Sequence, residues 1–173
     1  MTVTAVTHGI GKGLVAGLIG TVAMTVSSTI EQKARGRPAS SAPAHAAEKT
    51  LGIEKFQSDA HEQRFSTLVH WGYGTGWGVV RGLLRAAGLP PKAATAIHGA
   101  ALWGSEQVML PVLDVAPPVT MWGRTEIAID AWHHLVYIVT TGIADELLDR
   151  SVQVRTPRHP QRPRRGPAPR CRR

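Results

Sequence analysis

The chain contains 173 residues, carries a formal net charge of +8 and has a single cysteine, Cys171. This length predicts one domain, and one cysteine excludes both a disulfide within the chain and a metal site built from cysteines. Residues 1–150 contain all 12 acidic residues, whereas residues 151–173 contain eight Arg residues and no acid. We therefore expect a formally neutral domain at 1–150 and a disordered, Pro/Arg-rich basic tail at 151–173.

Four segments of the domain are predicted to cross a membrane as helices. Each is close to the roughly 20 residues that an α-helix needs to span the hydrocarbon core. The segments are residues 10–30, 65–84, 93–113 and 126–143. The predicted fold class is therefore all-α, a four-span transmembrane helical bundle. The mean hydropathy of −0.08 keeps a water-soluble helical bundle as the alternative.

Small residues recur at every fourth position in three of these segments. In a water-soluble helix each glycine costs about 1 kcal/mol relative to alanine, but in a bilayer this spacing lets two helices pack backbone to backbone. We expect these faces to hold helices together, within one copy or between copies in a homo-oligomer. A glycine-rich loop around residues 72–78 is the alternative. The series are Gly9, Gly13 and Gly17; Gly74, Gly78 and Gly82; and Ala96, Ala100 and Gly104.

The linkers between the segments differ in composition. Residues 31–64 are polar, with room for a short helix near residues 46–54, and residues 85–92 form a tight turn. Residues 114–125 contain Pro117-Pro118. Because proline lacks a backbone N–H, Pro111 is expected to kink or end the third helix.

The distribution of Lys and Arg predicts the orientation of the chain across the membrane. The Arg-rich tail, the N-terminus and the 85–92 turn are expected in the cytoplasm. The 31–64 linker, with six Lys and Arg residues, fits this orientation least well. The tail is expected to contact anionic lipid headgroups. Nucleic-acid binding is not expected, since no aromatic residues alternate with the arginines.

Ionisable side chains interrupt the predicted spans, most densely at residues 126–137. At about 100° per residue, Asp130, His133 and Tyr137 fall on one face with Glu126, and His134 flanks them. Ionisable groups are costly in lipid and mark functional candidates, and a carboxyl group beside a histidine can share a proton near neutral pH. The candidate proton or cation site comprises Asp130, His133, His134, Glu106, His70 and His98, and Glu126 is placed at the outer interface.

Other interpretations of these residues stay open. Each one also fits a structural role, in hydrogen bonds or ion pairs between helices, and a non-catalytic membrane scaffold or assembly protein is the main alternative function. A metal- or haem-dependent enzyme is a weaker alternative, because Asp130-x-x-His133 supplies only one of the two paired motifs of di-iron bundles. No metal ligand, cofactor or catalytic residue is assigned. Arg81 is expected to extend to the membrane interface.

Several short motifs lie along the chain: Leu110-Pro111, Ala116-Pro117-Pro118, Glu126, Asp130 and His134-Leu135-Val136, with Phe65-Ser66 and Gly72-Tyr73 earlier in the chain. Together they resemble the YagU-like family of bacterial inner-membrane proteins, which implies the cytoplasmic membrane of a bacterium. The resemblance implies membrane location and architecture, and it adds weight to Asp130 and His134, whereas His133 is extra to the pattern. Asp130 stands where the family pattern suggests Glu. Because the family is functionally uncharacterised, the resemblance implies no reaction.

Overall fold

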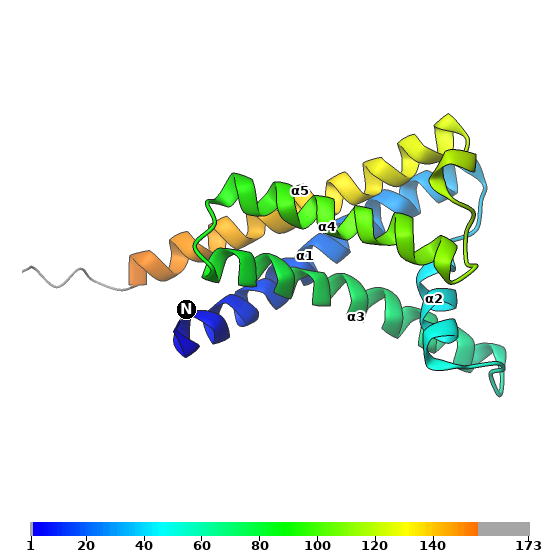
Figure 1. The fold of residues 1–173 in the computed structure, drawn as a ribbon, viewed down its shortest axis with the longest axis horizontal. Coiled ribbons are helices and arrows are strands. Elements are labelled where there is room, and N and C mark those ends of the chain that lie inside the picture. Colours follow the sequence, from blue (N-terminus) through cyan, green and yellow to red (C-terminus); the bar gives the residue numbers. More distant parts are fainter. Residues whose placement is uncertain (1, 156–173) are drawn as a thin grey trace, which may run out of the picture.

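The structure, a computed structural model, describes residues 2–155, and these form helices joined by short linkers (Figure 1). No strand occurs within residues 2–155, which confirms the predicted all-α class for this part of the chain. The elements are α1 (Val3–Arg35), α2 (Ala42–Leu51), α3 (Asp59–Ala86), α4 (Pro91–Val112), the short 3-10 helix η1 (Val119–Met121) and α5 (Arg124–Arg155).

Two of these helices, α1 and α5, are long and apolar enough to cross a membrane, judged by length and composition. The other two predicted spans, residues 65–84 and 93–113, correspond to α3 and α4. Because these two helices do not meet the same criterion of length and hydropathy, a bundle with four membrane-spanning helices stays a prediction.

The ends of the helices follow local rules. The Thr2 side chain accepts a hydrogen bond from the backbone N–H of Ala5 at 3.3 Å and caps α1, as is typical of helix N-termini. Gly36 ends α1 with φ of 63°, a left-handed conformation that glycine adopts without strain. Pro111 lies in the last turn of α4, which ends at Val112, so the prediction that it ends the helix is confirmed.

Two predicted boundaries need correction. The short helix expected near residues 46–54 is α2, which begins at Ala42 and ends before Gly52. The helix α5 continues to Arg155, so the prediction of disorder was wrong for residues 151–155. No Gly or Pro occurs between Gly142 and Pro157 to end the helix earlier. The rest of the predicted tail, residues 156–173, with its expected lipid contacts, lies outside the described residues.

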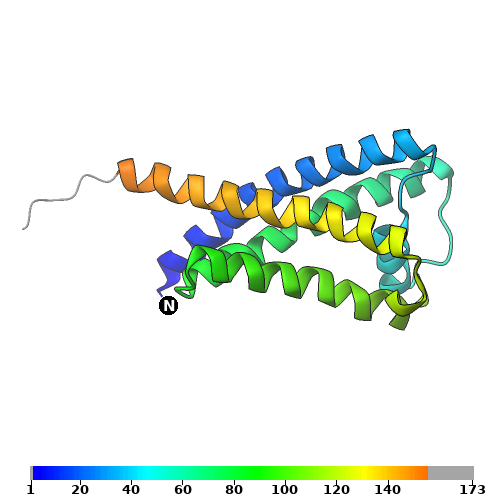
Figure 2. The same ribbon diagram turned by 90° about the horizontal axis from the view of Figure 1, so that it is seen from above.

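The long helices run alternately between the two ends of an elongated bundle (Figures 1 and 2). The start of α1, the turn between α3 and α4 and the last part of α5 lie at one end, which we call the turn end. The linker after α1, α2 and η1 lie at the opposite end, which we call the loop end. The helix α1 packs most closely against α3 and then against α5, and α4 contacts the bundle less.

Glycines hold α1 and α3 in backbone contact. A β-carbon placed on Gly9 would lie 2.8 Å from the carbonyl oxygen of Gly82, and one placed on Gly17 would lie 2.6 Å from that of Thr75. Such distances leave no room for a side chain, so the predicted role of these glycines in helix packing is confirmed within one copy. Residues 72–78 are helical, and the alternative of a glycine-rich loop was wrong.

The interior of the bundle is rich in polar side chains, while large apolar side chains cover its outside. In α1 the apolar window is only 28% buried, and in α5 only 33%. This is the reverse of the usual distribution in water-soluble proteins. Buried polar residues include Thr21, Arg81, His98, His133, His134, Thr141 and Asp145. Exposed apolar residues include Leu14, Leu18, Val22 and Val26 on α1 and Leu135, Val139, Ile143 and Leu147 on α5.

Candidate functional site

Three of the predicted site residues meet between α4 and α5. The Nε2 atom of His134 lies 2.6 Å from a carboxylate oxygen of Glu106. The Nδ1 atom of His134 lies 2.8 Å from the backbone carbonyl oxygen of Asp130 and 3.5 Å from its carboxylate. The indole N–H of Trp103 donates a hydrogen bond to the Asp130 carboxylate at 2.7 Å. We call Trp103, Glu106, Asp130 and His134 the His134 cluster.

Helix periodicity explains how these four residues come together. Asp130 and His134 are four positions apart on α5, and Trp103 and Glu106 are three positions apart on α4. Residues at these spacings are neighbours on one helix face. The two facing pairs therefore form a compact cluster in which His134 is only 6% exposed.

The hydrogen bonds of His134 fix which nitrogen carries its first proton. A backbone carbonyl only accepts hydrogen bonds, so Nδ1 must donate to Asp130. The short contact between Nε2 and Glu106 then holds one more proton. That proton lies either on the imidazole, giving an ion pair, or on the carboxyl group, giving a neutral pair. This arrangement can take up and release a proton without moving a helix.

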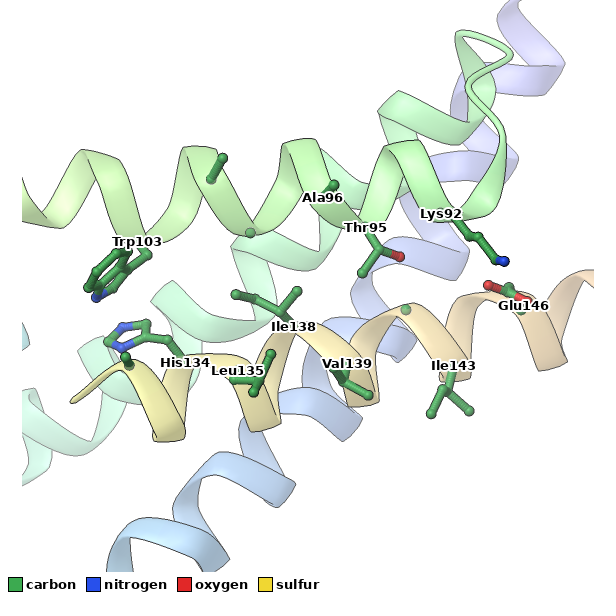
Figure 3. A pocket seen from close by; sticks show the side chains of 14 residues that line it. Lys92, Thr95, Ala96, Trp103, His134, Leu135, Ile138, Val139, Ile143 and Glu146 are labelled. Atoms are coloured by element: carbon green, nitrogen blue, oxygen red, sulfur yellow. The ribbon is translucent and has the colours of Figure 1, made fainter. Parts of the chain in front are cut away.

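The His134 cluster opens on a groove between α4 and α5 (Figure 3). Trp103 and His134 face each other at one end of the groove, and Lys92 and Glu146 lie at the other. The groove has a volume of about 600 Å³ and is otherwise lined mostly by apolar and small side chains. The cluster is therefore reached from the side of the bundle rather than sealed inside it.

His133 points away from this cluster, toward α1. Its Nδ1 atom lies 3.0 Å from the hydroxyl of Ser27, and its Nε2 atom lies 3.7 Å from the carboxylate of Glu31. Hydrogen bonds from Arg37 lower the pKa of Glu31. Of the two histidines predicted with Asp130, His134 contacts it, and His133 lies apart from the cluster.

The remaining predicted residues do not join the cluster. His70 contacts the Thr25 hydroxyl at 2.9 Å, which links α3 to α1. His98 is fully buried, and its Nε2 atom donates to the carbonyl oxygen of Trp77 at 3.1 Å. The carboxylate of Glu126 is 56% exposed at the loop end and lies 3.3 Å from Arg35. These contacts fit the structural interpretation given for each residue above.

The sequence did not predict a second polar cluster, which lies toward the turn end. Arg81 of α3 and Asp145 of α5 are both 0% exposed, and their charged groups lie 3.4 Å apart. Arg85 and Lys12 also face Asp145, at 3.6 and 3.8 Å. Asp149 completes the group through Arg85, at 3.1 Å, and Lys12. We call these five residues the Asp145 network.

The expectation that Arg81 extends to the membrane interface was wrong, because it is held inside the bundle by Asp145. Burial opposes ionisation of Asp149, but hydrogen bonds from Lys12 and Arg85 outweigh it and hold the pKa of that carboxyl group below its usual value. One feature of the sequence could have indicated the Asp145 network. Polar residues repeat along α5 beyond the predicted span, at His134, Tyr137, Thr141 and Asp145.

Together, the fold and the two clusters define a bundle of long helices with a polar interior. Among residues 2–155, no group of three or more His, Cys, Asp or Glu side chains is placed to hold a metal ion. Comparisons of the chain with protein-family models, with curated proteins and with solved structures find no match. The resemblance to the YagU-like family therefore stays a prediction.

Proposed function

We propose that the chain is an integral membrane protein of a bacterial cytoplasmic membrane in which the pair of Glu106 and His134 binds and releases a proton. The main support for this proposal is the 2.6 Å contact between these side chains. The backbone carbonyl of Asp130 adds to it, because it fixes Nδ1 of His134 as a hydrogen-bond donor. Proton exchange at such a pair changes the charge inside the bundle without a metal or cofactor.

Membrane insertion is supported by the distribution of side chains. Leucine, valine and isoleucine cover the outer faces of α1 and α5, and large exposed apolar patches mark contact with a membrane or another protein. In the proposed orientation the turn end faces the cytoplasm, and residues 10–30, 65–84, 93–113 and 126–143 lie in the bilayer. The Glu106–His134 pair then lies nearer the outer face.

Insertion predicts the behaviour of the protein during fractionation. After alkaline carbonate treatment of bacterial membranes that contain the protein, we expect it to stay in the membrane pellet and to enter solution only with detergent. Hydrophobic burial of α1 and α5 in lipid is the reason. A protein that entered the carbonate supernatant would be a water-soluble bundle, and the proposal would fail.

The proton site is tested by replacing Glu106 with glutamine. Glutamine keeps the size and a hydrogen bond but removes the charge beside His134. We expect the proton affinity of His134 to fall about tenfold to a hundredfold, since hydrogen bonds to charged groups contribute about 1.5–3 kcal/mol. The readout is nitrogen NMR of histidine-labelled protein in liposomes, with the His134 signal assigned from a His134→Gln variant.

The matched control for this experiment is Glu126→Gln, which removes an exposed carboxylate that lies on α5 beside Arg35. This variant is expected to leave the His134 signal unchanged. The titration runs from about pH 4 to about pH 10, because buried groups can differ by about three units or more from their reference pKa. If His134 keeps one protonation state over this range in the unaltered protein, the Glu106–His134 pair is a structural contact and not a proton site.

A non-catalytic scaffold is the second candidate, favoured by one observation. Gly72 and Gly76 on α3 and Gly104 on α4 have no atoms near the position of a β-carbon, so these small residues are not used in packing within one copy. Small residues on exposed faces suit contact with another membrane helix. Cross-linking of the protein in native membranes would reveal a homo-oligomer or a partner, and a strictly monomeric product would count against this role.

A further inference from the structure

One face of α5 carries a continuous line of buried polar side chains. His134, Tyr137, Thr141 and Asp145 are spaced by three or four positions, and none is more than 6% exposed. From His134 to Asp145 the helix rises about 16 Å, which is roughly half of the hydrocarbon thickness of about 30 Å. The line therefore connects the His134 cluster with the Asp145 network.

Several atoms along this line are buried without a hydrogen-bond partner. They are the Thr141 hydroxyl, the Nδ1 atom of His98 on the adjacent helix α4, and both carboxylate oxygens of Asp145, which face the cations of the Asp145 network without a hydrogen bond. Nearly all buried polar atoms in proteins are paired with protein or ordered water. Here the unpaired atoms gather between two polar clusters, with the His98 and Tyr137 rings 5.8 Å apart. Such a row of donors and acceptors suits the passage of protons through bridging water.

Beside Tyr137 and Thr141, the neighbouring helix α1 presents a glycine, Gly20, to this line. A β-carbon placed on Gly20 of α1 would overlap the Thr141 hydroxyl and would lie 3.0 Å from the Tyr137 ring. Glycine therefore lets α1 approach α5 at the level of the Thr141 hydroxyl. A second buried threonine, Thr21, differs in that its hydroxyl donates to its own helix, at the carbonyl of Gly17, at 2.8 Å.

We propose that this line carries protons across the bundle between the His134 cluster and the Asp145 network, so that the protein moves protons through the membrane. This inference rests on the proposed proton site at His134. A proton leaves Nε2 of the imidazolium of His134, and the hydroxyls of Tyr137 and Thr141, with bridging water, each accept one proton and donate another. The Tyr137 hydroxyl donates to the carbonyl oxygen of Gly74 in the structure, so it turns away from this carbonyl to take part. The proton arrives on the Asp145 carboxylate, which becomes a neutral acid, and no electrons move.

Cationic groups from two helices set the direction of release at the turn end. Arg81 and Arg85 from α3 and Lys12 from α1 face Asp145. Their positive charges oppose a proton that stays on Asp145, so the proton leaves Asp145 for water at the turn end, where the side chain of Asp149 is 25% exposed. At the other end the proton on His134 faces three groups, which are Glu106 of α4, Asp130 of α5 and the phenol of Tyr73 of α3 beside Glu106.

The test is proton flux in liposomes that contain the full-length protein and an internal pH-sensitive dye, driven by a potassium diffusion potential. Replacing Thr141 with valine keeps the shape and removes the hydroxyl. We expect the flux to fall by at least about a hundredfold, the scale on which positioned groups assist proton transfer. Thr141→Ser should retain the flux. The matched control is Thr21→Val, which alters an equally buried threonine outside the line and is expected to leave the flux unchanged.

The outcomes separate this inference from the function on which it rests. If His134 titrates but the proton flux does not exceed that of protein-free liposomes, the proposed proton path is overturned and the proposed proton site at His134 is kept. Full flux in Thr141→Val would also overturn the path. If that variant does not fold, judged by helical content and elution in detergent, Thr141→Ala removes the hydroxyl without a methyl group to fit, and full flux in it is equally decisive. A histidine that does not titrate would instead remove the proposed site.

Discussion

Replacing Gly78 with alanine is expected to push α1 away from α3 and to lower the free energy of unfolding by about 3 kcal/mol or more, the upper range for overpacking. A β-carbon at Gly78 would overlap the carbonyl oxygen of Gly13 and the backbone of Gly17. Because backbone atoms cannot rotate out of the way, the helices must separate along their length. The measurement is unfolding of the purified protein in mixed micelles, followed by circular dichroism.

The same helix supplies a matched control. Gly76 lies two positions from Gly78, and nothing lies within 4 Å of the position of its β-carbon. Gly76→Ala is therefore expected to leave stability unchanged or to raise it by up to about 1 kcal/mol through better helix propensity. Gly13→Ala and Gly11→Ala on α1 form a second pair with the same expected contrast, since Gly11 is also uncovered. Equal stability of the Gly78 and Gly76 variants would contradict the close approach of α1 and α3.

The glycine contacts show which part of the fold was predictable from sequence. A four-residue repeat of small side chains is a local pattern, and it marks a face suited to close packing whatever the partner. It does not identify that partner. The sequence therefore predicted that Gly9, Gly13 and Gly17 pack against a helix, but only the structure shows that Thr75, Gly78 and Gly82 meet them.

The His134 cluster was predictable in part for the same reason. Asp130 and His134 are neighbours on any α-helix, and Glu106 was named because a carboxyl group in the middle of a span needs a partner. The sequence alone could not show whether His133 or His134 contacts Asp130. At about 100° per residue, His133 and His134 lie about 60° and 40° from Asp130 on opposite sides. The position of α4 decides between them, and that is a tertiary contact.

The Asp145 network was missed because it depends on contacts distant in sequence. Asp145 lies two positions beyond the predicted span, which ends at residue 143, and it was not named among the candidate residues. Its burial comes from Lys12 on α1 and Arg81 on α3. A lone arginine near the end of an apolar segment usually extends to water, and only the presence of a buried acid across the bundle reverses that expectation.

The largest effect outside the glycine contacts is expected from Arg81→Met. Removing this guanidinium leaves Asp145, which is 0% exposed, without its closest buried cation. Removal of one partner of a buried ion pair typically costs about 3–5 kcal/mol. Arg35→Met is the control, because the pair of Arg35 and Glu126 is exposed and such pairs contribute about 0–1 kcal/mol. Both variants are compared by the same micelle unfolding assay.

A double variant distinguishes a stabilising pair from one retained for function. Arg81→Met combined with Asp145→Leu replaces both charges with apolar side chains, and such exchanges are often neutral or stabilising. We therefore expect the double variant to recover most of the stability that Arg81→Met loses. Recovery without proton flux would mean that the buried charges serve the proton path rather than the fold. A double variant that stays as unstable as Arg81→Met would show instead that Lys12 and Arg85 also need the Asp145 carboxylate, so the network would be a structural element of the bundle.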